Sequence, residues 1–261
     1  MRPRLLIAVV TIAVATLVGA NALTSVGLHA QGRGAAQAPP TPRAAAPVDL
    51  TGYWVAVISE DWRWRMVTPA KGDYASIPLN VAGKNLADTW DPARDEKAGE
   101  VCKAYGAPGL MRGPTRLHIT WLDDTTLKLE TDYGMQTRLF QFSAARNGAA
   151  AGLSLQGVTT AEWLRAGRGG GRGAPSRGSM KSVTTRLRAG YLRKNGVPYS
   201  ANTVFTEYWD LVPGPGSSQW LVVTNTVDDP ANLQTPWITS VHFKKEPDGA
   251  KWDPTPCSTR F

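Results

Sequence analysis

The sequence predicts an all-β, mainly antiparallel fold, a barrel or sandwich of about ten strands with one or two short helices. Three observations predict it. Segments rich in β-branched and aromatic residues recur at short spacing. Several of them alternate apolar and polar residues with the two-residue period of a strand. Segments with helix-start signals are few.

The first expected strand is 51–58 (TGYWVAVI), and the second is 62–67, where Trp62, Trp64 and Met66 would share one face. Further strands are expected at 116–122, 126–131, 135–142, 152–160, 182–188, 204–212, 219–227 and 238–245. Turn residues separate several of them. Asp123-Asp124 and Gly134 mark tight turns, and Asn195-Gly196 is typical of a hairpin in which both residues adopt positive φ.

Two short helices are expected, at 80–90 and 91–105. Asp91 is a suitable N-cap, Pro92 fits the first helical position, and the acidic pair Asp95-Glu96 favours the first turn. Gly106 is expected to end the second helix.

The N-terminus has the pattern of a secretory signal peptide, assigned to 1–30. A basic start precedes an apolar run over 5–18, and small residues offer cleavage before Leu23 or before Gln31. An uncleaved membrane anchor is the alternative. The Ala-, Gly- and Pro-rich stretch 31–47 is expected to be a flexible tether. Residues 48–261 then form a single β-rich domain, periplasmic or secreted.

The chain has two cysteines, Cys102 and Cys257. In an oxidising compartment an even pair predicts one disulfide, which would hold the C-terminal tail on the domain. Two separate buried thiols are the alternative.

The formal net charge of +8 comes largely from one stretch of the chain. From Arg165 to Lys194 the chain has nine basic residues and no acidic residue. Within this stretch lies a Gly/Arg-rich loop at about 165–179, whose core GRGGGRGAPSRG lacks any residue suited to a hydrophobic core. A solvated insertion is expected, and weak contact with anionic surfaces is the alternative. Nucleic acid is not expected as a partner, because aromatic residues do not interleave the arginines.

Two tripeptides resemble the lipocalin fingerprint. Gly52-Tyr53-Trp54 begins the first strand, and Thr131-Asp132-Tyr133 follows at a spacing near that of the family. The resemblance implies a calycin-like barrel with a cavity and does not indicate the ligand. About 130 residues follow Thr131, more than a lipocalin has.

Longer segments resemble a group of secreted bacterial proteins without an assigned activity. The resemblance is carried by 89–92 (TWDP), 190–200 (GYLRKNGVPYS), 206–208 (TEY) and 228–237. It implies export and a shared fold, and no particular reaction.

One candidate acid/base pair is His118 with Glu130. Across the expected hairpin, the strand face that carries His118 meets Glu130, and Arg138 follows on the next strand. Inside a barrel the pair would act in proton transfer. On the solvent face it would be a cross-strand ion pair of small value. The histidines are too widely spaced to predict a metal site, and the sequence has no cofactor motif.

The leading interpretation is an exported β-barrel that binds a small, largely apolar ligand. Trp62, Trp64 and Tyr208 are the candidate apolar lining, and Arg138 and Glu207 are the candidate polar contacts. One alternative is a barrel enzyme of the isomerase, cyclase or hydrolase type that uses His118 and Glu130. The other alternative is an envelope-associated interaction protein.

Overall fold

The computed structural model describes residues 38–142, 152–165 and 178–259. The chain divides into two units, Met1–Pro39 and Pro40–Phe261, and nearly all described residues belong to the second. The expected signal peptide, the first part of the tether and the core of the Gly/Arg-rich loop lie outside the described residues. Among the residues that are described, no helix has the length and apolar character needed to cross a membrane.

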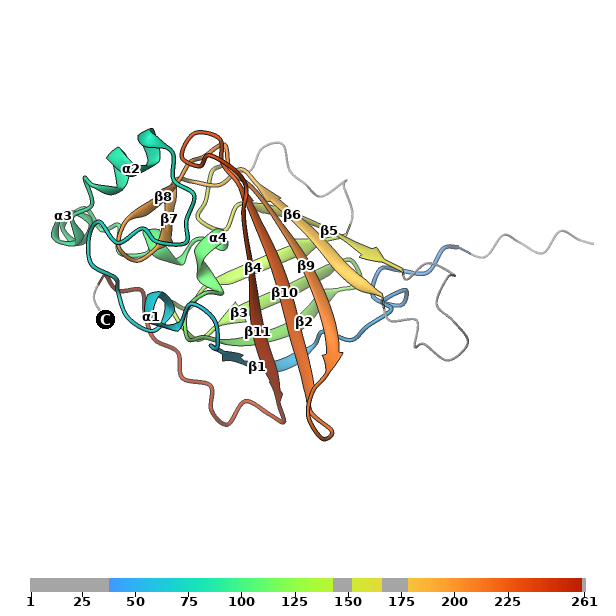
Figure 1. Ribbon diagram of the computed structural model, residues 1–261. Coiled ribbons are helices and arrows are strands. Elements are labelled where there is room, and N and C mark those ends of the chain that lie inside the picture. Colours follow the sequence, from blue (N-terminus) through green and yellow to red (C-terminus); the bar gives the residue numbers. More distant parts are fainter. Residues whose placement is uncertain (1–37, 143–151, 166–177, 260–261) are drawn as a thin grey trace, which may run out of the picture. The chain divides into compact units, whose positions relative to one another are not determined.

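Nine strands of the second unit close into a barrel, in the order β1-β11-β10-β9-β6-β5-β4-β3-β2 (Figure 1). The strands are β1 Gly52–Val57, β2 Arg116–Asp123, β3 Thr126–Thr131, β4 Thr137–Gln141, β5 Val158–Leu164, β6 Ser179–Thr185, β9 Val204–Pro213, β10 Gln219–Asp228 and β11 Trp237–Glu246. Neighbours are antiparallel except β4 and β5, which pair in parallel over two residues. The predicted all-β barrel is therefore confirmed, with one parallel junction.

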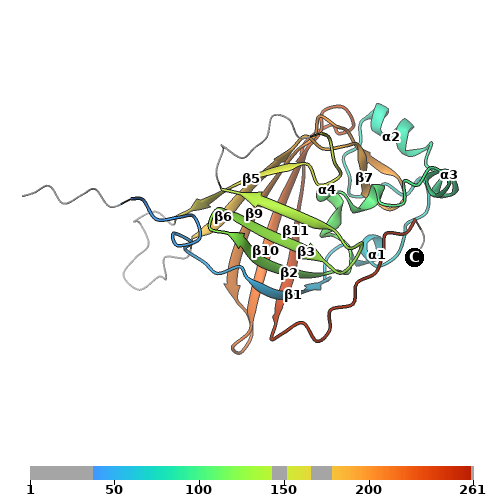
Figure 2. The ribbon, with the colours of Figure 1, turned by 180° about the vertical axis from the view of Figure 1, so that it is seen from behind.

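Helices and a small hairpin gather at one end of the barrel, as Figures 1 and 2 show from opposite sides. They are α1 Trp62–Arg65, α2 Val81–Ala87, α3 Pro92–Lys97, the 3₁₀ turn η1 Lys103–Tyr105, α4 Ala107–Leu110, and the paired strands β7 Gly190–Arg193 and β8 Val197–Tyr199. This end of the barrel carries the pocket described below.

Two elements differ from expectation near this end. The expected strand at 62–67 is the short helix α1, because Asp61 turns the chain with a positive φ of 52° and Arg65 is buried against the barrel end. The expected helix at 91–105 is shorter. Asp91 caps it as predicted, with its carboxylate accepting from the backbone N–H of Ala93 and Arg94, but α3 ends at Lys97.

The other strands occur close to their expected positions. The exception is 152–160, of which only the last residues belong to β5. The Asn195-Gly196 turn does join a hairpin, but only Gly196 has a positive φ, of 81°. Arg193 pairs with Val197, so the loop has three residues and places glycine at the left-handed position.

The barrel interior is packed. Trp54, Phe140, Trp209 and Phe243 belong to one core cluster and are fully buried. A second cluster, including Tyr199, lies between the hairpin, the helices and the strand ends. In β2 the fully buried Leu117 and Ile119 alternate with partly buried neighbours.

The chain segments before β1 and after β11 both contact the rest of the domain. The predicted disulfide is confirmed, joining Cys102 to Cys257 with a Cα–Cα distance of 5.1 Å. The segment after β11 returns to the end where the helices gather (Figure 1), and Thr255 pairs with Tyr133 on the way. At the other terminus, the carbonyl of Pro42 accepts a 2.8 Å hydrogen bond from the Trp163 indole, so the last part of the expected tether contacts β5.

Candidate functional site

The predicted acid/base pair is brought together on the outer face of the barrel. His118 and Glu130 are cross-strand partners, and His118 Nδ1 lies 3.5 Å from Glu130 Oε2. The imidazole stacks on Tyr53 at 4.2 Å between ring centroids, with the Trp252 ring on edge against both. Glu130 also pairs with Lys128 at 2.9 Å. The pair therefore belongs to a partly covered surface cluster and does not face the interior.

The five predicted ligand-binding residues do not meet in a single site. Arg138 and Glu207 form an ion pair inside the barrel, whereas Trp62 is 63% exposed and Tyr208 is 37% exposed. Trp64 alone of the five lines the pocket described next.

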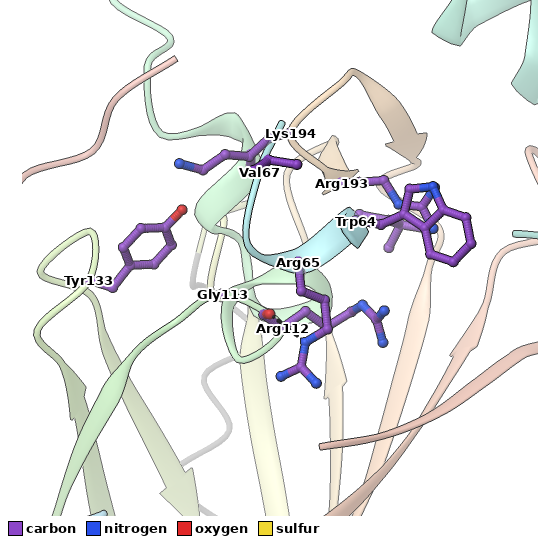
Figure 3. A pocket seen from close by; sticks show the side chains of 11 residues that line it. Trp64, Arg65, Val67, Arg112, Gly113, Tyr133, Arg193 and Lys194 are labelled. Carbon is purple, nitrogen blue, oxygen red and sulfur yellow. Dashed lines mark hydrogen bonds between the residues drawn. The ribbon is translucent and has the colours of Figure 1, made fainter. Parts of the chain in front are cut away.

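A pocket lies beside α1 at the helical end of the barrel, with about 380 Å³ of empty space that includes its opening to solvent. Figure 3 shows Tyr133 and Lys194 on one side, Trp64 and Arg193 on the other, and Arg65 with Arg112 between them. The remaining lining residues are Val67, Ala104, Gly109, Gly113 and Leu192. Four cationic side chains thus come to one pocket from α1, the end of α4, and the β7–β8 hairpin. We call this the arginine pocket.

Arg65 and Arg112 form the centre of the arginine pocket. Arg65 Nε donates to the Arg112 carbonyl at 2.8 Å, and its Nη1 pairs with Glu60. Arg112 Nη2 donates to Asp61 at 2.8 Å, and its guanidinium lies 4.8 Å from the centroid of the Trp237 ring. The other terminal nitrogens, Arg65 Nη2 and Arg112 Nη1, are buried and have no hydrogen-bond partner among the described residues.

Arg193 and Trp64 form a second side. The Arg193 guanidinium donates to the carbonyls of Asp73 and Ala75 and lies 5.4 Å from the Trp64 ring centroid. The Trp64 indole donates to the Asp73 carboxylate at 3.0 Å. Among the described residues Arg193 forms no ion pair with a carboxylate, although the charges of Asp61 and Asp73 act on it.

Lys194 and two tyrosines form the third side. Lys194 Nζ lies 3.0 Å from the Tyr105 hydroxyl, 4.8 Å from the Tyr105 ring centroid and 4.7 Å from that of Tyr133. The disulfide-bonded tail supports this side, because the backbone N–H of Ser258 also donates to the Tyr105 hydroxyl.

Burial disfavours positive charge in the arginine pocket. Desolvation, with a smaller contribution from repulsion by Arg112, lowers the pKa of Arg65 and of Arg193 to about 10. Desolvation also lowers the pKa of Lys194 to about 8. All three side chains remain mainly protonated at pH 7. A bound anion would therefore offset an electrostatic cost that the folded site already carries.

Sequence reasoning missed most of this site. Arg65 falls in the expected strand 62–67, and Arg112 stands in no motif. The one usable signal was the basic run that ends at Arg193-Lys194, followed by a hairpin turn. Within this basic run, no sequence feature distinguishes Arg193 and Lys194 from the arginines of the Gly/Arg-rich loop. Most of that loop lies outside the described residues.

Within the described ranges, no three His, Cys, Asp or Glu side chains are grouped closely enough to hold a metal ion. The chain matches no protein-family model, and neither curated proteins nor solved structures gave a similar protein.

Proposed function

We propose that this protein is an exported β-barrel that binds a small ligand through an oxyanion group, carboxylate, sulfate or phosphate, in the arginine pocket. One observation carries the proposal. Arg65 Nη2 and Arg112 Nη1 are buried charged donors without an acceptor in the described chain. A buried unsatisfied donor costs about 1–3 kcal/mol, and more when charged. An oxyanion supplies acceptors and negative charge together.

Because the barrel interior is filled by side chains, we place the ligand at the helical end of the barrel, in the arginine pocket. Trp54, Trp209 and Phe140 fill the volume that a largely apolar ligand would need. The arginine pocket has about 380 Å³ of empty space, part of which is its opening to solvent. That space suits an anionic group, with the remainder of the ligand near Trp64 and the opening.

Export is part of the proposal. The basic start, apolar run and small residues of 1–30 support a cleaved signal peptide. The Cys102–Cys257 disulfide supports an oxidising compartment such as the periplasm or the exterior. The complete burial of Trp54 at the start of β1 supports the proposed calycin-like relationship.

The test is calorimetric titration with sulfate, phosphate and acetate at constant ionic strength. Arg112→Lys keeps a positive charge near Asp61 but removes the fork of donors, so we expect at least one anion to bind about 10-fold more weakly. Arg63→Lys is the matched control, because Arg63 is exposed on the same helix as Arg65. We expect it to bind as the unaltered protein does.

Circular dichroism and thermal melting establish that both variants fold. Absence of saturable binding for all three anions would contradict the proposal. Equal losses in Arg112→Lys and Arg63→Lys would also contradict it, because they would indicate general charge attraction.

A further inference from the structure

Lys194 carries the one primary amine of a pocket whose other cationic side chains, among the described residues, are guanidinium groups. It stands in the three-residue loop between β7 and β8, next to Arg193, whose guanidinium forms another side of the arginine pocket. Figure 3 shows the Lys194 amine and the Tyr133 hydroxyl close together on the side opposite Trp64. An anion held by Arg65 and Arg112 would share the pocket with this amine.

The charged and titratable groups around Lys194 come from several elements. Tyr105 of η1 and Tyr133 of the β3–β4 turn lie against the amine, and burial raises the pKa of Tyr133. Arg65, Arg112 and Arg193 share the arginine pocket with it. On its other side, Lys194 lines a smaller cleft with Asp95, Glu100 and Lys103.

The two carboxylates of that cleft have cationic partners of their own. Asp95 pairs with Lys103 at 2.8 Å, and Glu100 pairs with Arg188 at 2.6 Å. Burial lowers the pKa of the Lys194 amine. With a pKa of about 8, it is the free base at pH 7 roughly 300-fold more often than an ordinary lysine.

We propose that Lys194 forms a reversible imine with a small anionic carbonyl compound, an aldehyde or 2-oxo acid whose carboxylate is held by the arginines. The inference rests on the proposed anion site and adds the chemical class of its ligand. The arginines supply affinity for the carboxylate, and Lys194 supplies a nucleophile for the adjacent carbonyl carbon.

The reaction replaces the C=O bond of the carbonyl compound with a C=N bond to Lys194 and releases one water molecule. The nitrogen lone pair attacks the carbonyl carbon, and the carbonyl oxygen takes up a proton to give a carbinolamine. Loss of the hydroxyl with a second proton forms the C=N bond and releases water. The nitrogen supplies both protons overall, and Tyr105, at 3.0 Å from it, is placed to relay them. No oxidant or reductant takes part, and water reverses the reaction.

The experiment treats the full mature chain at pH 7 with glyoxylate and then sodium borohydride, which fixes an imine as a carboxymethyl-lysine. Peptide mass spectrometry then compares labelling at Lys194 with labelling at Lys84, an exposed lysine of α2. We expect labelling at Lys194 to be at least about 10-fold faster, because its free-base fraction is larger and the carboxylate is held nearby. Sulfate should slow labelling at Lys194 and leave Lys84 unchanged.

Acetaldehyde is the matched neutral probe, for which we expect a smaller preference for Lys194 than glyoxylate gives. Equal labelling of Lys194 and Lys84 by glyoxylate would overturn the imine proposal, even if sulfate binds and the anion site stands. An equal preference for acetaldehyde would overturn the anionic class of the ligand. Failure of the anion titrations above would instead remove the proposed function itself.

Discussion

Arg138 and Glu207 form a doubly hydrogen-bonded ion pair inside the barrel. Arg138 Nη1 lies 2.8 Å from Glu207 Oε1, Arg138 Nη2 lies 2.6 Å from Glu207 Oε2, and both side chains are fully buried. Ser182 and Thr184 hydrogen-bond to the pair from β6, and the guanidinium lies 4.8 Å from the Phe140 ring centroid. The pair therefore links β4, β6 and β9 through the packed core.

Breaking this pair should strongly destabilise the fold. Glu207→Gln leaves the buried guanidinium without its counter-charge, so we expect the free energy of unfolding to fall by about 3–5 kcal/mol. Urea denaturation measures it. The control is Glu162→Gln, which breaks the largely exposed pair of Glu162 with Lys181 and should cost about 1 kcal/mol or less. Similar losses in the two variants would show that the interior pair does not support the barrel.

Removing the disulfide should lower stability without removing the barrel. The bond closes a loop that spans a sequence separation of 155 residues, so we expect the Cys102→Ser, Cys257→Ser double variant to lose about 2–5 kcal/mol in unfolding free energy. Urea denaturation of both forms checks this. Peptide mapping without reductant should find the two cysteines linked. Two free thiols in the unreduced, denatured protein are the result that this prediction does not allow.

Sulfate affinity should fall as the pH rises through about 8. Lys194 has its pKa lowered to about 8 by burial, so the pocket loses one positive charge across this range, while Arg65 and Arg193, with pKa values of about 10, stay protonated. The loss of one nearby charge should weaken binding by about 1–2 kcal/mol. Titration calorimetry between pH 6.5 and about 9 measures it, and sulfate itself does not titrate there.

Lys194→Met is the matched variant for this pH profile. It should bind more weakly at low pH and show no fall near pH 8. A wild-type profile that is flat across this range, or a fall that persists in Lys194→Met, would assign the titration to another group.

Deleting the Gly/Arg-rich loop should leave the barrel intact. Leu164 and Ser179 pair directly across β5 and β6, so a short turn can join Arg165 to Ser179. We expect the free energy of unfolding to change by about 1 kcal/mol or less. A thermal melt tests this, and a large drop in melting temperature would mean that the loop packs.

The same deletion tests the alternative expectation for this loop, weak contact with anionic surfaces. If the arginines of the loop make this contact, salt-sensitive binding to anionic lipid vesicles should be lost on deletion. Binding that persists unchanged in the deletion variant would assign the contact to another part of the chain.

The barrel strands could be predicted because their signals, the alternation of apolar and polar residues and the turn residues between strands, depend only on residues close in the sequence. The 116–122 and 126–131 hairpin forms with His118 opposite Glu130, as expected. The same alternation at 62–67 was misleading, because Arg65 is fixed by the carbonyl of Arg112, a partner far along the chain. The arginine pocket depends on such distant contacts, which barrel closure creates and no local pattern contains.

The central claim is that an oxyanion occupies the arginine pocket. The most direct measurement is an anomalous difference map from a crystal of the protein soaked in selenate, a heavy analogue of sulfate. We predict a selenium peak in the arginine pocket, with oxygens within hydrogen-bond distance of Arg65 Nη2 or Arg112 Nη1. A pocket that holds only water beside these nitrogens, at selenate concentrations that saturate other anion sites, would contradict the account.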